Sequence, residues 1–215
     1  MEIQIKNITK IIKGKYVIDN ISVNFESGKI YGLRGINGSG KTMLLRLLAG
    51  LIYANSGDIL VDGYKLSKDI DFPKNMGILI ENPAFLDTYS GYMNLKLLTS
   101  IQGKVKDSQI YKTLERVGLE PHNKKKYKKY SLGMKQRLGI AAAIVEKPNL
   151  LLLDEPTNAL DTDGVEILKN IIKTEKRRGT LIIMTCHDPV ILEELSDEII
   201  LLENGKIKED IHEKS

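Results

Sequence analysis

The sequence predicts an α/β fold with a mainly parallel sheet, an N-terminal antiparallel β sub-domain and an inserted helical sub-domain. Short apolar runs alternate with segments of helical periodicity along much of the chain, which is typical of parallel strands joined by helices. Residues 1–30 alternate polar and apolar side chains between turn signals, as antiparallel strands do. Between residues 83 and 148 no strand-like run occurs, and apolar residues recur at helical spacing instead.

Length and composition favour a single domain over residues 1–215. With 42% apolar and 28% charged residues, the 215-residue chain can bury one substantial core without metals or disulfides. Its 32 basic residues nearly balance 28 acidic ones, and a net charge of +4 does not indicate a nucleic-acid partner. The single cysteine, Cys186, fits a reducing compartment, and the N-terminus lacks the apolar stretch of a signal peptide, so we expect a cytoplasmic protein. The apolar runs are far shorter than the roughly 20 residues that span a bilayer, so membrane contact is expected to be indirect.

The expected elements follow one another in a simple order. Residues 1–30 and 56–64 form the antiparallel sub-domain, and residues 83–148 form the helical sub-domain. A helix is expected over residues 43–51. The strands of the parallel sheet are expected at residues 29–33, 76–80, 150–153, 180–185 and 198–202. Asn204 and Gly205 lie between apolar runs and predict a two-residue hairpin turn of the primed type.

A glycine-rich segment follows the strand at residues 29–33 and opens a helical stretch. It consists of Gly35, Ile36, Asn37, Gly38, Ser39, Gly40, Lys41 and Thr42. This spacing is typical of a phosphate-binding P-loop, in which glycines let backbone N–H groups point inward at a helix N-terminus. Lys41 adds positive charge at the outer phosphates, and Thr42 offers a hydroxyl to Mg²⁺. The segment therefore predicts the core of a P-loop NTPase.

Two adjacent carboxylates, Asp154 and Glu155, end the apolar run at residues 150–153. A buried strand stops where charges appear, so both acids should lie at the carboxyl edge of the sheet, where α/β proteins bind ligands. Asp154 then suits a contact to Mg²⁺ through a water molecule. Glu155 could orient or deprotonate a water molecule.

Three further segments complete a pattern. Residues 130–134 read Tyr-Ser-Leu-Gly-Met, residues 158–161 read Asn-Ala-Leu-Asp, and residues 185–188 read Thr-Cys-His-Asp. Together with the P-loop and the acidic pair, in this order and at this spacing, they resemble the nucleotide-binding subunit of ATP-binding-cassette (ABC) transporters. The resemblance covers nearly the whole chain.

The resemblance implies that two such domains dimerise head to tail, as a homodimer or a heterodimer, with ATP and Mg²⁺ at their interface. Ser131 and Gly133 would contact the nucleotide held by the P-loop of the other domain, and Asp161 would belong to the D-loop. His187 would contact the γ-phosphate and hold the attacking water with Glu155. A separate transmembrane permease is implied as well, which would place the chain at the inner face of the cell membrane.

One departure from the family pattern points to a cargo. Glu81 stands where most members have the glutamine of the Q-loop, and its carboxylate could still ligate Mg²⁺ while adding a negative charge. Similar glutamate loops, with a Ser-Leu-Gly-Met type of signature, occur among exporters that protect bacteria from lantibiotics, bacitracin and related antimicrobial peptides. The alternative is a neutral surface substitution.

Other departures concern contacts to the nucleotide. Leu132 and Met134 replace the glycine and glutamine of many signatures, which leaves Ser131 and Gly133 as the expected contacts. Met43 replaces a second hydroxyl, so only its backbone N–H can reach the phosphates. Tyr16 is the nearest aromatic residue to the adenine-stacking position, and it either stacks on the base or is an ordinary edge-strand residue.

Two segments keep alternative interpretations. Lysines at 124–126, 128 and 129 are either a solvated surface or a patch near the partner's triphosphate or anionic lipid. Residues 82–102 form either part of a groove for the permease or ordinary helical core. A non-transport ABC ATPase is the alternative function, although such proteins need a second cassette, a coiled coil or zinc modules. A GTPase is disfavoured because no Asn-Lys-x-Asp segment is present.

Overall fold

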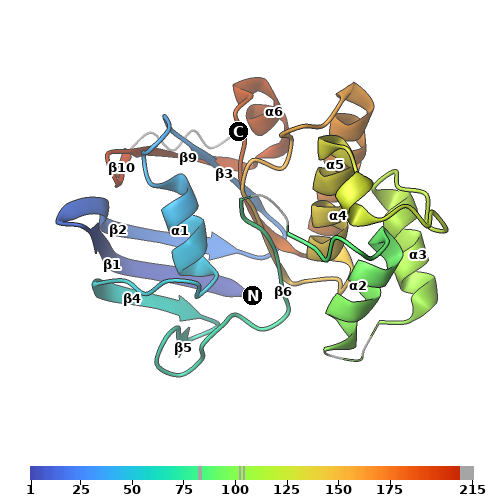
Figure 1. Cartoon of the computed structure of the whole chain (residues 1–215). Helices are drawn as coiled ribbons and strands as arrows, with labels where there is room; N and C mark the ends of the chain where they lie inside the picture. Colours follow the sequence, from blue (N-terminus) through green and yellow to red (C-terminus); the bar gives the residue numbers. More distant parts are fainter. Residues whose placement is uncertain (82–83, 102, 104, 209–215) are drawn as a thin grey trace.

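The computed structural model describes residues 1–81, 84–101, 103 and 105–208 (Figure 1). A six-stranded sheet has the order β10-β9-β3-β8-β7-β6. Its strands are β3 (Ile30–Arg34), β6 (Met76–Leu79), β7 (Leu150–Leu153), β8 (Leu181–Thr185), β9 (Glu198–Glu203) and β10 (Lys206–Lys208). All neighbours pair in parallel except β9 with β10. The expected parallel sheet is confirmed.

A second sheet is antiparallel and contains the N-terminus. Its order is β2-β1-β4-β5, built from β1 (Glu2–Ile12), β2 (Lys15–Glu26), β4 (Ser56–Val61) and β5 (Tyr64–Lys65). Between the two sheets lies α1 (Lys41–Leu48), whose buried leucines face a core shared by both. The helix begins two residues before the expected position and ends three residues earlier, because it starts directly after Gly40 and Gly50 adopts a positive φ.

The central strands β7 and β8 are buried along their whole length, as continuous apolar runs predict. Because side chains alternate across a strand, Leu150 and Leu152 pack on the core with α1, whereas Leu151 and Leu153 pack on the opposite face. That opposite face is covered by α5 (Thr162–Arg177), α6 (Pro189–Leu195) and the helical sub-domain. The sheet therefore separates two cores.

The helical sub-domain lies to one side of the molecule, green to yellow in Figure 1. It comprises α2 (Gly91–Ser100), α3 (Asp107–Arg116), a 3₁₀ turn at Tyr127–Lys129 and α4 (Leu132–Ile144). The helix α4 begins earlier than its apolar pattern indicates, because Ser131 caps its N-terminus by accepting a hydrogen bond from Met134 N–H. Among the described residues, no helix combines the length and the apolar character needed to cross a bilayer.

The turn between β9 and β10 is the predicted hairpin. Asn204 and Gly205 have φ values of 51° and 78°, the left-handed conformations that a primed turn requires. Gly205 N–H donates to Ser39 O at 3.0 Å, and Asp19 N–H donates to Gly205 O at 2.8 Å. The hairpin thus holds the glycine-rich loop from outside and ties it to β2.

Candidate active site

The glycine-rich loop joins the end of β3 to the first turn of α1. Gly40 has φ 110° and forms the N-cap of α1, and a Cβ there would come within 2.7 Å of Val17 O. At Gly38, by contrast, a Cβ would meet no atom within 4 Å, so this part of the loop is open. The buried hydroxyl of Ser39 has no hydrogen-bond partner among the described residues. The loop therefore offers an unpaired hydroxyl beside a helix N-terminus, which suits an anion.

Lys41 lies across this loop. Its Nζ donates to Gly35 O at 2.7 Å and to Ile36 O at 3.1 Å. The ammonium group is thereby held on the loop side of the site. A phosphate held by the loop would meet this positive charge at short range.

Asp154 and Glu155 follow β7 directly, at the carboxyl edge of the sheet, as predicted. The side chain of Asp154 is mostly buried; its Oδ2 accepts from Thr42 Oγ1 at 2.8 Å and its Oδ1 accepts from Thr185 Oγ1 at 2.9 Å. Glu155 N–H donates to the same Thr185 Oγ1 at 2.7 Å. One hydroxyl of β8 therefore fixes both acids.

The carboxylate of Glu155 is mostly buried and keeps one oxygen unpaired. Its side chain is only 16% exposed, and its buried Oε2 has no hydrogen-bond partner among the described residues. Its Oε1 lies 4.0 Å from Nε2 of His187, whose side chain is 61% exposed. A partly buried carboxylate with a free oxygen can accept a hydrogen bond from a water molecule and orient it.

Some of these groups, but not Thr42, Asp154 or Thr185, line one cavity of about 430 Å³. Its lining includes Gly35, Ile36, Lys41, Glu155 and His187. The structure thus brings together residues from the β3–α1 loop, the end of β7 and the end of β8. The loop residues are separated from the ends of β7 and β8 by more than a hundred positions in the sequence.

Sequence reasoning missed Thr185, which is fully buried. A threonine at a strand end has many ordinary roles, and only the pairing of β7 with β8 shows its position between both acids. The change Thr185→Val removes one donor and leaves Asp154 Oδ1 and Glu155 N–H unpaired. We expect a loss of about 1–3 kcal/mol in the free energy of unfolding, together with slower nucleotide hydrolysis.

Urea denaturation and steady-state hydrolysis would measure both effects. The matched control is Thr185→Ser, which keeps the hydroxyl and should restore most of the rate. A rate for Thr185→Val equal to that of Thr185→Ser would show that the hydroxyl does not position the acids.

The structure gives Glu81 a different partner from Thr42 and Asp154, which bond to each other. Its carboxylate pairs with the guanidinium of Arg46 on α1, and its side chain is mostly exposed. Sequence reasoning missed this pairing, since Arg46 gives no signal of it. The next residues, Asn82 and Pro83, and Gln102 of the expected permease groove lie outside the described residues. The contact of Glu81 with Mg²⁺ stays a prediction.

The signature residues lie outside this cavity. Ser131 caps α4, Leu132 is 74% exposed, and a Cβ at Gly133 would come within 2.9 Å of Ala159 O. Asp161 caps α5, accepting from Gly164 N–H at 3.0 Å and from Arg137 Nη2 at 2.7 Å. These two donors, Gly164 first, lower the pKa of the Asp161 carboxyl. Within one chain, Ser131 and Gly133 therefore do not line the cavity that the P-loop lines.

Two further candidate nucleotide contacts, Tyr16 and Met43, lie outside the cavity. Tyr16 lies on β2 opposite Ile11 and is 59% exposed, one residue before Val17, whose carbonyl lies against Gly40. It does not line the cavity. Met43 lies in the first turn of α1 and packs on the core between the sheets, so its side chain points away from the loop.

Comparison with known proteins gives consistent relatives. The family described as ABC transporter matches residues 18–158. The ABC transporter ATP-binding protein YybJ of Bacillus subtilis (strain 168) is 50% identical over 206 residues, 96% of this chain and 94% of its own. The lantibiotic transport ATP-binding protein SrtF of Streptococcus pyogenes is 38% identical over 95% of this chain and 88% of its own. The bacitracin transport ATP-binding protein BcrA of Enterococcus faecalis is 37% identical over 98% of this chain and 69% of its own.

A solved structure confirms the fold class. The dimeric structure of the ATP-binding cassette MJ0796, in a post-hydrolysis state bound to ADP and Pi, superposes with a TM-score of 0.87. It covers 98% of both chains at 22% identity. With the family match over residues 18–158 and relatives of up to 50% identity along almost the whole chain, this protein belongs to the ABC transporter family.

Proposed function

We propose that the chain is an ATP-hydrolysing subunit that powers a separate transmembrane permease, an exporter of antimicrobial peptides or similar amphiphiles. The observation that carries the ATPase assignment is the convergence of Lys41, Glu155 and His187 on one cavity beside the glycine-rich loop. Glu155 contributes a buried carboxylate oxygen, Oε2, that has no hydrogen-bond partner among the described residues.

Each group has a role that its surroundings support. The backbone N–H groups of residues 35–43 and the ammonium of Lys41 hold the triphosphate. Thr42, and Asp154 through a water molecule, would hold Mg²⁺; the two side chains are joined by a hydrogen bond. Among the described residues no group of three or more His, Cys, Asp or Glu is placed to hold a metal ion. Mg²⁺, when bound, neutralises charge on the phosphates.

Glu155 acts on the attacking water. Its free Oε2 accepts a hydrogen bond from the water and orients it in line with the bond to be broken, taking up its proton as the bond to phosphorus forms. His187, exposed at the mouth of the cavity, donates to the γ-phosphate. Thr185 holds the backbone of Glu155 in place during this step.

A second cassette completes the site. Ser131 and Gly133 lie at the N-terminus of α4 and outside the cavity of their own chain, so they are free to meet the nucleotide of another. Asp161 belongs to the adjacent D-loop. We propose a head-to-tail dimer with ATP at the interface, at the inner face of the membrane beneath the permease.

The proposed cargo rests on two observations. Relatives named for lantibiotic and bacitracin transport are 37–38% identical to this chain over nearly its whole length. Glu81 and the Ser-Leu-Gly-Met signature agree with that group.

Co-expression with a candidate permease, sought among the genes beside this one, tests the proposed cargo. We expect the pair to raise the minimal inhibitory concentration of bacitracin or a lantibiotic, and the Lys41→Ala variant to abolish the increase. Unchanged sensitivity to every peptide tested, with ATPase activity intact, would reject the cargo and keep the ATPase.

A further inference from the structure

The turn between β9 and β10 lies directly behind the glycine-rich loop, and Gly205 is its point of contact. Gly205 N–H donates to Ser39 O of the loop at 3.0 Å, and Gly205 O accepts from Asp19 N–H of β2 at 2.8 Å. Gly205 is buried, and both groups of its backbone are therefore in use. One holds the loop, and the other holds the antiparallel sheet.

The packing around Gly205 leaves no room for a side chain. Its φ is 78°, and a Cβ there would lie 2.9 Å from Val17 O. A Cβ at Gly40 of the loop would meet the same oxygen at 2.7 Å. The turn, the loop and β2 therefore meet backbone against backbone, so the position of the turn determines the position of this part of the loop.

The hydrogen bond to Ser39 O also sets the direction of a donor on the other side of the loop. Ser39 O and Gly40 N–H belong to one peptide unit, and in a trans peptide these two groups point in opposite directions. Ser39 O points outward to Gly205, so Gly40 N–H points toward the inside of the loop. Gly40 is the N-cap of α1, where backbone N–H groups lack partners within the helix.

We propose that Gly205 is a positioning residue for the nucleotide: its N–H holds the Ser39–Gly40 peptide so that Gly40 N–H is aimed at a phosphate. A donor that is fixed in advance need not be ordered on binding, which raises affinity. This inference rests on the proposed function, since it takes the loop to hold a nucleotide, and it adds a residue from outside the loop. P-loop N–H groups contact the α- and β-phosphates, which ADP and ATP share, so both nucleotides should depend on Gly205.

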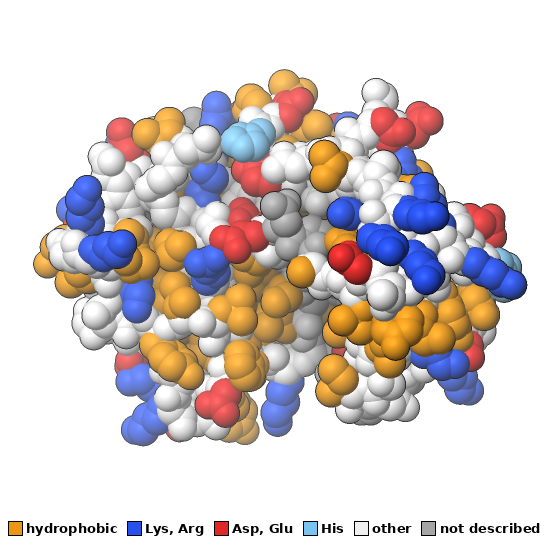
Figure 2. Space-filling view, in the orientation of Figure 1, with side chains coloured by type: hydrophobic (Ala, Val, Ile, Leu, Met, Phe, Trp, Pro, Cys, Tyr) orange, Lys and Arg blue, Asp and Glu red, His pale blue; other side chains and the backbone are white. Residues whose placement is uncertain are grey.

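The β1–β2 turn provides a matched control. Lys13 and Gly14 have φ values of 49° and 75°, close to the 51° and 78° of Asn204 and Gly205. Gly14 is exposed, however, and a Cβ there would meet no atom within 4 Å. Figure 2 shows basic side chains at the left end of the molecule, where this turn lies in Figure 1. Alanine at Gly14 therefore imposes the same backbone strain without disturbing the loop.

Equilibrium binding of fluorescent ADP and ATP analogues to the full chain tests the proposal. In Gly205→Ala the new Cβ pushes the turn away from Val17 and weakens its hold on Ser39. We expect the Kd of both nucleotides to rise on the order of tenfold, the worth of one hydrogen bond to a charged group. The kcat at saturating ATP should stay within about twofold of wild type, because the attacking water is not involved. Gly14→Ala should leave both Kd values within about twofold of wild type.

A second measurement uses the unaltered chain and decides the question even if Gly205→Ala does not fold. If the bond between Gly205 and Ser39 favours nucleotide binding, a bound nucleotide must stabilise that bond by the same factor. Amide hydrogen exchange followed by NMR reports this stability. ADP should slow the exchange of Gly205 N–H on the order of tenfold and leave exchange at Gly14 unchanged.

Three results would overturn the role of Gly205: equal Kd values in the two glycine variants, a fall in kcat with unchanged Kd, or exchange of Gly205 N–H that ADP does not slow. A wild-type chain that binds neither nucleotide would reject the proposed function and this inference with it. A wild-type chain that binds and hydrolyses ATP, while the two glycine variants bind alike, would reject only the role of Gly205.

Discussion

Replacing Glu155 with glutamine is expected to slow ATP hydrolysis by about 10²–10⁴-fold while leaving ATP binding close to wild type. Glutamine keeps the shape of the side chain and one carbonyl oxygen. Glutamine cannot take up a proton from water. Its amide nitrogen also carries N–H donors, whereas the carboxylate oxygen Oε2 of Glu155 only accepts hydrogen bonds. The contacts of Lys41 with the loop and of Thr42 with Asp154 do not involve Glu155 and should persist. Release of phosphate and equilibrium binding of a fluorescent ATP analogue measure the two quantities separately.

The matched control is Glu166→Gln, which makes the same chemical change on α5. Glu166 is exposed and pairs with Lys169, away from the cavity. Its hydrolysis rate should equal that of wild type. If Glu155→Gln hydrolysed ATP at a rate within a factor of three of the control, Glu155 would not take part in the chemical step.

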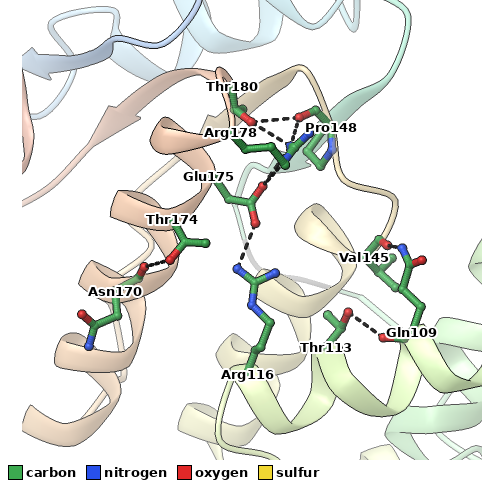
Figure 3. A network of polar contacts seen from close by, with 10 residues as sticks. All are labelled: Gln109, Thr113, Arg116, Val145, Pro148, Asn170, Thr174, Glu175, Arg178 and Thr180. Atoms are coloured by element: carbon green, nitrogen blue, oxygen red, sulfur yellow. Dashed lines mark hydrogen bonds and ion pairs between the residues drawn. The ribbon is translucent and has the colours of Figure 1, made fainter.

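The second large effect concerns stability and centres on Glu175, drawn in Figure 3. This residue of α5 is charged but almost wholly buried. Its Oε1 accepts from Arg116 of α3 at 2.9 Å, and its Oε2 accepts from Arg178 at 2.9 Å. Arg178 also donates to Thr180 Oγ1 at 2.7 Å and to the carbonyl of Pro148. One carboxylate therefore joins the helical sub-domain to α5 and to the starts of β7 and β8.

Glu175→Ala should lower the free energy of unfolding by about 3 kcal/mol, because two arginines lose their partner and a cavity remains. For a chain of this size that is a fall of about 6–12 °C in Tm. Arg116→Ala should cost less, about 1–2 kcal/mol, since Arg178 still pairs with the carboxylate. Thermal and urea unfolding followed by circular dichroism give both values.

Glu115→Ala is the control for this prediction. Glu115 is an exposed neighbour of Arg116 on α3, and its removal should change stability by less than about 0.5 kcal/mol. If Glu175→Ala were as mild as Glu115→Ala, the three-residue network would not hold the sub-domains together.

Much of the fold can be predicted from local patterns of residues in the sequence. The buried strands β7 and β8 are uninterrupted apolar runs, and the Asn204-Gly205 turn has the chemistry its geometry demands. The loop from Gly35 to Thr42 could be located because its function needs a fixed spacing of glycine, lysine and hydroxyl. These features are determined by neighbours in the chain.

The contacts that could not be predicted join distant positions through side chains with many possible roles. Thr185 bridges both acids only because β8 pairs beside β7. Arg46 on α1 and Glu81 after β6 form an ion pair, and no feature of the sequence indicates that these two residues are in contact. From the sequence, Glu175 would be expected to be an exposed charge on an amphipathic helix. In the structure it is buried and pairs with two arginines.

The most direct test of the composite site is the oligomeric state of the Glu155→Gln variant with ATP and Mg²⁺, measured by sedimentation velocity. We predict a monomer without nucleotide and a dimer with it, because ATP that is not hydrolysed stays between the P-loop of one chain and Ser131 of the other. Adding Ser131→Asp should abolish the dimer: aspartate still caps α4 but places a negative charge against the γ-phosphate. A chain that binds ATP yet stays monomeric at every concentration, or a dimer that is indifferent to Ser131→Asp, would contradict the account.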